Sequence, residues 1–316
     1  MTITRRELLA GAGLAIGAAA LGALRPGGAR AATARRIALT MDDPQHQATP
    51  LLEPAERDAK IRAALRAAKV QAALFVTGKR VDDRAGRRLL KAWDADGHLL
   101  GNHTYSHRNL NSDDITANWF TADIARGEAV VADRKQFRRL FRYPYLKEGE
   151  TAAKRDAVRA FLDERGYRVG HVTVDASDWY VDQRLRARLD ADPHAALDGY
   201  RDFYLAHIDD RMAYYDGLAV ELLGVSPPHT LLIHHSLLNA LFLGDLIAHL
   251  RGRGWSVIDA GEAFADPLYA RRPATLPAGE SLIWALAKET GRFEARLRYP
   301  GEDAPYEAPA MDERGL

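Results

Sequence analysis

His103 and His107 are the residues of this sequence whose type and spacing most clearly indicate chemistry. They lie four positions apart, and an Asp42-Asp43 pair lies upstream of them. Two imidazoles and a carboxylate form the ligand set of an open catalytic zinc site. On a helical turn, residues four apart point to the same side, so the spacing predicts that both rings reach one ion. Surface histidines also meet this spacing, and the pair alone does not establish a metal site.

The adjacent carboxylates of Asp42 and Asp43 follow a short apolar segment at residues 36–40. Neighbouring carboxylates repel each other unless a cation lies nearby. A bound metal ion removes this conflict, because one carboxylate binds the ion and the other faces the water that the ion activates. The alternative is an Asp-Asp turn or a helix cap, which needs no ion.

Three later segments fit the same chemistry. They are Phe141-Arg142-Tyr143-Pro144-Tyr145, Asp175-Ala176-Ser177-Asp178-Trp179 and Leu231-Leu232-Ile233-His234-His235. Together with the aspartate pair and the histidine pair they resemble, in order, the five motifs of the polysaccharide deacetylase (NodB-type) family, whose members are metal-dependent de-N-acetylases and amidohydrolases. The resemblance covers residues 35–265.

The resemblance implies one divalent metal ion held by Asp43, His103 and His107. Zinc is the expected ion, although the same ligand set also takes cobalt, nickel or iron. Asp42 then has the role of general base, which removes a proton from the attacking water. His98 lies outside the ligand spacing, and we expect it to support the site.

The third family motif implies roles for Arg142 and Tyr145. A guanidinium beside a carboxylate keeps it ionised and orients it, so Arg142 is expected to pair with Asp42. The backbone N–H of Tyr145 is expected to stabilise the oxyanion, and Tyr145 to contact the substrate. Leu146 replaces the family's glycine, and Pro44 stands where the family usually has another glycine. Leu146 is expected to contact the substrate and either to narrow the groove or to alter its loop, and Pro44 is expected to stiffen the loop after the aspartate pair.

The fourth and fifth motifs imply a general acid. Asp178 is expected to hold the catalytic histidine, and Trp179 to line the pocket unless it lies in the core. The register of the fifth motif gives the acid role to His234, while His235 replaces the family's usual aspartate. Because strand residues alternate between faces, only one of the two histidines can enter the site. Asp175 is expected to support the same network.

These roles predict hydrolysis of an amide into an amine and a carboxylate. The resemblance favours an N-acetylated sugar or glycan as the substrate. Two alternatives stay open. One is an amidohydrolase that acts on small linear or cyclic amides with the same site, and the other is a non-catalytic, carbohydrate-binding member of the family. The sequence does not identify a protein partner.

Apolar segments alternate with helical patterns along the chain, which predicts an α/β fold with a parallel sheet. Strands are expected at 36–40, 70–76, 140–141, 167–174, 230–233 and 255–258, and helices at 56–69, 89–95, 112–134, 151–165 and 241–250. Most candidate residues follow a strand, as in a (β/α) barrel or in an open doubly wound sheet. The family resemblance favours a distorted, incomplete (β/α) barrel of seven or eight parallel strands.

The expected catalytic domain spans residues 33–265 and contains a helical insertion at 180–229. The insertion is rich in aromatic residues at near-helical spacing, which favours core packing over a sugar-binding platform. Residues 266–316 form an expected C-terminal extension packed on the domain, with one helix at 280–290.

Residues 1–32 have the pattern of an export signal. Arg5-Arg6 precede an Ala- and Gly-rich apolar run from Leu8 to Leu24, and Ala29-Arg30-Ala31 offers a cleavage site. This pattern predicts a twin-arginine (Tat) signal peptide and a periplasmic or secreted protein. A retained membrane anchor or an ordinary N-terminal helix is the alternative. The run is short and weakly apolar for a stable span, so we expect no membrane span after cleavage.

The charge composition predicts no nucleic-acid partner. The sequence has 44 Lys and Arg against 43 Asp and Glu, for a net charge of +1, and its basic residues are dispersed. It has no cysteine. A zinc site must therefore use histidine and carboxylate ligands, and no disulfide supports the fold.

Overall fold

The computed structural model of this protein describes residues 35–297 and 304–316. They belong to one compact unit, Thr33–Leu316. The predicted signal peptide at residues 1–32 lies outside the described residues. Within the described part of the chain, no helix combines the length and apolar character that crossing a membrane requires.

A parallel sheet of seven strands forms the centre of the fold. Its strands are β1 (Arg36–Asp42), β2 (Ala73–Val76), β3 (Leu99–Asn102), β4 (Phe137–Phe141), β6 (Arg168–Val169), β7 (Pro228–His234) and β8 (Ser256–Ile258). The spatial order is β6-β4-β3-β2-β1-β7, and β8 also pairs with β1. β1 pairs along its whole length with β7, with β2 through Thr40–Asp42, and with β8 through Arg36–Ala38.

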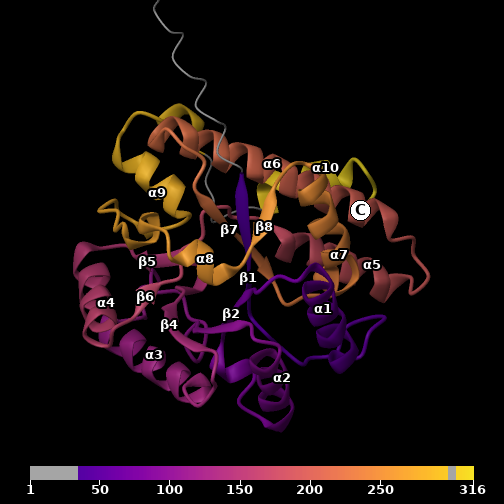
Figure 1. Cartoon of the computed structure of the whole chain (residues 1–316), viewed down its shortest axis with the longest axis horizontal. Helices are drawn as coiled ribbons and strands as arrows, with labels where there is room; N and C mark the ends of the chain where they lie inside the picture. Colours follow the sequence, from indigo (N-terminus) through magenta and orange to yellow (C-terminus); the bar gives the residue numbers. More distant parts are fainter. Residues whose placement is uncertain (1–34, 298–303) are drawn as a thin grey trace, which may run out of the picture. The chain divides into compact units, whose positions relative to one another are not determined.

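Helices pack around this curled sheet (Figure 1). They include α1 (Pro54–Ala68), α2 (Arg84–Ala95), α3 (Ala117–Val131), α4 (Ala152–Glu164), α7 (Leu237–Gly252) and α8 (Ala260–Phe264). The central strand is apolar and fully buried at Ile37, Ala38 and Leu39, as expected for a parallel strand covered on both faces. The predicted fold class, an incomplete (β/α) barrel, is confirmed.

The segment from β6 to Val174 links the two ends of the sheet. β6 pairs with β4, whereas Val174 forms an isolated parallel bridge with Leu231 of β7. A side chain at Gly170 would lie 2.3 Å from the ring of Phe75, so the chain crosses close over the sheet at this glycine. The prediction of one continuous strand over 167–174 is therefore wrong, because these residues leave β4 and approach β7 instead of following one neighbour.

The expected insertion is helical and begins slightly earlier than predicted. It consists of α5 (Asp178–Ala191) and α6 (Asp198–Leu223). Four of its aromatic residues are buried in the main core: Tyr200, Phe203, Tyr204 and Tyr215. These side chains are therefore core residues and do not form a sugar-binding platform.

The C-terminal residues add several elements to the same unit. β9 (Ala278–Gly279) pairs antiparallel with β5 (Lys147–Gly149), and α9 (Leu282–Glu289) and α10 (Ala304–Asp312) follow. The backbone N–H of Leu282 donates to the carbonyl oxygen of Val172 at 2.7 Å. Short 3₁₀ helices complete the described chain: η1 (Gly78–Arg80), η2 (Pro144–Leu146), η3 (Pro267–Ala270) and η4 (Glu294–Arg296).

Candidate active site

The candidate residues meet where the parallel strands end. Asp42 is the last residue of β1, and His234 is the last residue of β7. His103 and Arg142 directly follow β3 and β4. A cavity of about 510 Å³ opens at this edge, and its lining includes Asp42, Asp43, His103, His107, Tyr145, Leu146, Asp175, Trp179 and His234. The position agrees with the rule that parallel α/β sheets build their sites at the carboxyl ends of the strands.

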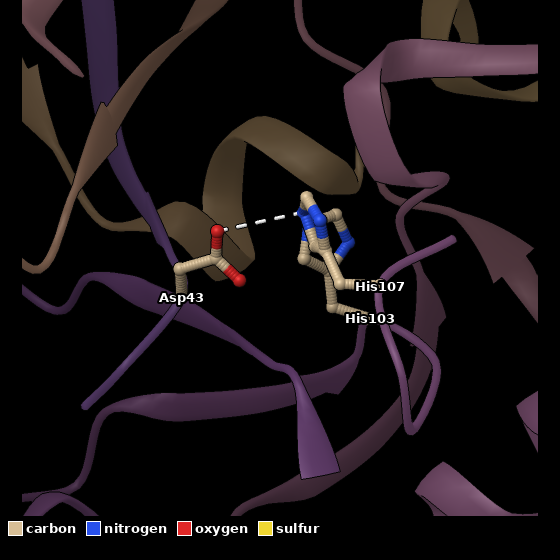
Figure 2. A group of neighbouring side chains, drawn as sticks. All are labelled: Asp43, His103 and His107. Carbon is tan, nitrogen blue, oxygen red and sulfur yellow. Dashed lines mark ion pairs between the residues drawn. The ribbon is translucent and has the colours of Figure 1, made fainter. Parts of the chain in front are cut away.

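Asp43, His103 and His107 form a compact group of side chains that could hold a metal ion, and we call them the metal-ligating group (Figure 2). One ligand atom from each residue lies within 4.8 Å of the others. Within the group, Nε2 of His107 lies 3.4 Å from Oδ2 of Asp43. The hydroxyl of Thr77 donates to the other Asp43 oxygen at 2.6 Å. This contact leaves Oδ2 directed toward His107.

The two histidines do not lie on a helical turn, as their spacing had suggested. They lie in a loop after β3, where Thr104 has φ +64° and His107 has φ +56°. The His107 N–H donates to the Thr104 hydroxyl at 3.0 Å, which closes a tight turn. Helix α3 packs against this loop at Gly127. A side chain at this position would lie 2.6 Å from the Thr104 backbone, so only glycine allows the close contact. The turn brings the two rings to a centroid separation of 4.9 Å.

The protonation states of these residues suit a metal ion. The Nδ1–H of His103 donates to the carbonyl oxygen of Arg142 at 2.7 Å, which leaves Nε2 as the basic nitrogen of the neutral ring. Burial lowers the pKa of His107 to about 3, against the opposing charge of Asp43. Burial raises the pKa of Asp43, but the charges of His107, His103 and Arg80 outweigh it and hold that pKa low. A neutral imidazole and an ionised carboxylate are the metal-binding forms, so the donor set fits a divalent ion.

Asp42 and Arg142 form a buried ion pair beside this group. Nη1 of Arg142 donates to Oδ1 of Asp42 at 2.7 Å, and the two side chains are 1% and 4% exposed. Nε of Arg142 donates to the Gly170 carbonyl at 2.9 Å, and the guanidinium lies 3.9 Å from the centre of the Phe75 ring. The second Asp42 oxygen is 3.5 Å from Nε2 of His103. Arg142 therefore pairs with Asp42 and holds it next to the metal-ligating group.

His234 is held by two contacts with Asp178. Its Nδ1–H donates to Oδ1 of Asp178 at 2.7 Å, and its backbone N–H donates to Oδ2 at 2.7 Å. The Asn239 amide also donates to Oδ2, at 2.8 Å. Burial lowers the pKa of His234, but the charge and hydrogen bond of Asp178 outweigh it and raise the pKa to about 9. His234 is therefore protonated at neutral pH and can donate a proton.

His235 belongs to a different environment from His234. Its Nε2 lies 3.2 Å from Oδ1 of Asp58, and its ring packs 6.1 Å from Trp93. Its backbone N–H donates to the Asp42 carbonyl at 3.0 Å. The two neighbouring imidazoles thus contact different carboxylates, although β7 ends at His234 and both residues line the cavity.

Tyr145, Leu146 and Trp179 line the mouth of the cavity. Tyr145 and Trp179 are 57% and 40% exposed, so Trp179 is a wall of the cavity and not a core residue. The Tyr145 ring lies 4.7 Å from the His107 ring. The Leu146 carbonyl accepts a 2.8 Å hydrogen bond from Glu280 N–H, which ties this wall to the C-terminal extension.

Several residues near the site were not predicted from the sequence. Thr77 directly follows β2, and its position at the end of a predicted strand could have indicated that it belongs to the site. Asp182 and Arg186 line the cavity from α5 and lie at helical spacing from Asp178. Asn239 comes from the first turn of α7, and nothing in its local sequence indicates its contact with Asp178.

Residues 29–169 match the family model described as polysaccharide deacetylase. The segments with Asp178 and His234 lie beyond this match. None of the curated proteins is significantly similar to the chain.

Solved structures share the fold at low sequence identity. A CE4 family pseudoenzyme from Bacillus anthracis is 18% identical, with a TM-score of 0.50, over 73% of this chain and 66% of that chain. A mutant of this pseudoenzyme with restored enzymatic activity is 19% identical, with a TM-score of 0.50, over 73% of this chain and 68% of that chain. A peptidoglycan N-acetylglucosamine deacetylase is 20% identical, with a TM-score of 0.50, over 73% of this chain and 88% of that chain.

Proposed function

Because this chain belongs to the polysaccharide deacetylase family, we propose that it is a metal-dependent hydrolase that removes an acyl group, in the simplest case acetyl, from an N-acylated sugar or glycan. One observation carries the proposal. The buried ion pair between Asp42 and Arg142 contains the candidate general base, and the hydrogen-bonded pair of His234 and Asp178 contains the candidate general acid. Both pairs flank the metal-ligating group at a single cavity.

The metal-ligating group supplies the first requirement of the reaction. Asp43, His103 and His107 would hold one divalent ion, of which zinc is the best match, to polarise the acyl carbonyl and make water more acidic. The contacts of Thr77 with Asp43 and of Arg142 with His103 hold two of the three ligands in place.

Asp42 acts as the general base in this proposal. Its carboxylate takes one proton from the water that attacks the acyl carbon. Arg142 pairs with the carboxylate and fixes its direction. The backbone N–H of Tyr145 stabilises the negative charge that develops on the acyl oxygen.

His234 acts as the general acid. The bond between the acyl carbon and nitrogen breaks, and the ring of His234 gives a proton to the departing amine. Asp178 holds the ring by Nδ1 and keeps it protonated until that step. The products are a free amine and a carboxylic acid, which then ionises in water, and the proton taken by Asp42 balances the one given by His234.

Two other functions are alternatives to this proposal. The cavity of about 510 Å³ also suits a small linear or cyclic amide. A non-catalytic carbohydrate-binding role is the second alternative, since the family includes the pseudoenzyme described above.

A substrate panel separates the three functions. Purified metal-loaded protein is incubated with N-acetylglucosamine oligomers, peptidoglycan fragments and small amides, and released acid and amine are measured together. Release from the glycans supports the proposal, and release from small amides alone supports the first alternative. Binding of glycans without turnover, in protein that contains its metal, supports the second.

We also propose that the protein is exported by the twin-arginine route, on the basis of Arg5-Arg6 and the apolar run that follows. Replacement of both arginines by lysine should retain the protein in the cytoplasm. Unchanged export of that variant would reject the proposal.

A further inference from the structure

The α5 wall of the cavity carries charge that the proposed reaction does not use. Asp178, Asp182 and Arg186 follow one another at four-residue spacing and therefore share one face of the helix. Asp178 is committed to His234. Asp182 and Arg186 both line the cavity, one and two helical turns further along.

Arg186 has only a loose partner. Its Nη1 lies 3.9 Å from Oδ2 of Asp182, and its side chain is 41% exposed. Oδ1 of Asp182 accepts a 2.8 Å hydrogen bond from Leu238 N–H. Nε of Arg186 is buried and has no hydrogen-bond partner among the described residues. A buried donor without an acceptor is costly, so this guanidinium can still accommodate an anion.

A second guanidinium leaves excess positive charge next to Asp182. Arg57 is fully buried, and it donates to the carbonyl oxygens of Gln45 and Gln47 at 2.9 Å each. Neutral carbonyls do not cancel its charge. Asp182 and Arg186 are among the charges that act on Arg57, with opposite effects on its pKa. Asp58 also acts on Arg57, but it is already paired with Arg62 at 2.9 Å. Asp182 is therefore left between the charges of Arg57 and Arg186.

Two of the other carboxylates that line the cavity already have cations nearby. Arg142 pairs with Asp42 at 2.7 Å, and Arg80 lies 3.3 Å from Oδ2 of Asp43. The metal ion of the proposed function adds further positive charge there. An anionic group on a substrate would thus find net attraction in the part of the cavity lined by Arg186.

We propose that Arg186 binds a carboxylate of the substrate, so that the preferred substrate carries a carboxylate in addition to its N-acyl group. This inference rests on the proposed function. A guanidinium matches a carboxylate with two parallel hydrogen bonds, and a partly enclosed cavity strengthens the attraction. An acidic N-acylated sugar and an N-acylated amino acid share this chemistry.

Matched substrate pairs test the inference. The first pair is N-acetylmuramic acid and N-acetylglucosamine, which differ by one carboxylate-bearing substituent, and the second is an N-acetyl amino acid and its amide. For each pair, kcat/KM is measured and expressed as a ratio of acidic to neutral substrate. Calorimetric binding to the metal-loaded protein gives the same ratio for affinity. The pair with the larger preference identifies the source of the carboxylate.

The wild-type protein should prefer one acidic substrate by about tenfold or more. Arg186→Glu should abolish that preference, and Arg186→Lys should retain part of it. Arg188→Glu is the matched control, because Arg188 lies exposed on the same helix and does not line the cavity. It changes the net charge equally and should leave the ratio unaltered.

The outcomes separate this inference from the proposed function. Equal turnover of the acidic and neutral members of each pair, unchanged in Arg186→Glu, would overturn the inference. It would not count against the proposed deacetylase function. A preference lost equally in Arg188→Glu would also overturn it, since the effect would then be one of net charge. Absence of turnover with every pair counts against the proposed function, and the binding ratio still decides the role of Arg186.

Discussion

Asp178 accepts hydrogen bonds from both the Nδ1–H and the backbone N–H of His234, each at 2.7 Å. Two contacts from one carboxylate fix the position of the ring as well as its charge. Asn239 donates to the same carboxylate, and the Tyr204 hydroxyl donates to the Asn239 carbonyl at 2.8 Å. The acid of the proposed reaction is thus held by the helical insertion and α7.

Asp178→Asn should lower the pKa of His234. In the metal-free wild-type protein, His234 keeps its proton as the pH rises to about 9 and loses it above that value. An amide cannot supply the negative charge that opposes burial, so the variant should lose the proton at a lower pH. Imidazole chemical shifts measured by NMR during a pH titration report this change.

His249 provides an internal control for the titration, because its ring contacts Asp209 at 2.9 Å, away from Asp178. Its midpoint should not move. An unchanged His234 midpoint in Asp178→Asn would show that another group sets the charge of the ring.

His234→Ala should impair amide substrates more than activated esters. An amine leaving group needs a proton, whereas an activated phenolate does not. His235→Ala should show no such dependence, because its ring contacts Asp58 and not Asp178. The measurement is kcat/KM across leaving groups of increasing pKa, with circular dichroism to check folding. A steeper dependence in His235→Ala would exchange the two assignments.

Asp42→Asn should retain the metal ion but lose activity by about a hundredfold or more, in line with the loss of a general base. The change preserves the shape of the side chain and removes its basicity. Metal content and turnover are measured on the same sample. Loss of the ion together with activity would instead make Asp42 a metal ligand, and full activity would assign the proton to another group.

Glu307→Gln should destabilise the protein at neutral pH. Burial raises the pKa of Glu307, but His207 and Arg211 outweigh it and lower the pKa to about 2. The lowered pKa means that the stabilisation is complete above the ordinary value of 4.5 and is lost as the pH falls toward 2. We expect a decrease of about 2 kcal/mol in the unfolding free energy near pH 7, and a smaller difference near pH 3.

Denaturant titrations at the two pH values test this, with Glu313→Gln as the control, since Glu313 is exposed in the same C-terminal segment. Equal effects of the two substitutions, or a difference that grows as the pH falls, would contradict the prediction.

The sequence was most informative where short-range pattern decides structure. The apolar segment before Asp42 becomes β1, and the apolar segment before His234 becomes β7, which ends at that histidine beside Asp178. The loop of His103 and His107 was misjudged, because the same spacing is met by a helical turn and by a tight turn with two left-handed residues. Only the packing of the loop against Gly127 distinguishes them.

Long-range contacts could not be predicted from one sequence. Asn239 and Asp178 meet across 61 positions, and Arg211 and Glu307 across 96. Such pairs are set by how α5, α6, α7 and α10 pack, and no local propensity records that packing. The shortened β6 has the same cause, since the two ends of the sheet determine where residues 168–174 run.

The most direct test of the proposed function couples metal content to turnover in a His103→Ala, His107→Ala double variant. We expect one divalent ion per wild-type chain by elemental analysis, and release of equal amounts of carboxylate and amine from an N-acylated glycan. The double variant should fold, lack the ion and release neither product. Full metal occupancy or undiminished hydrolysis in the double variant would contradict the proposed site.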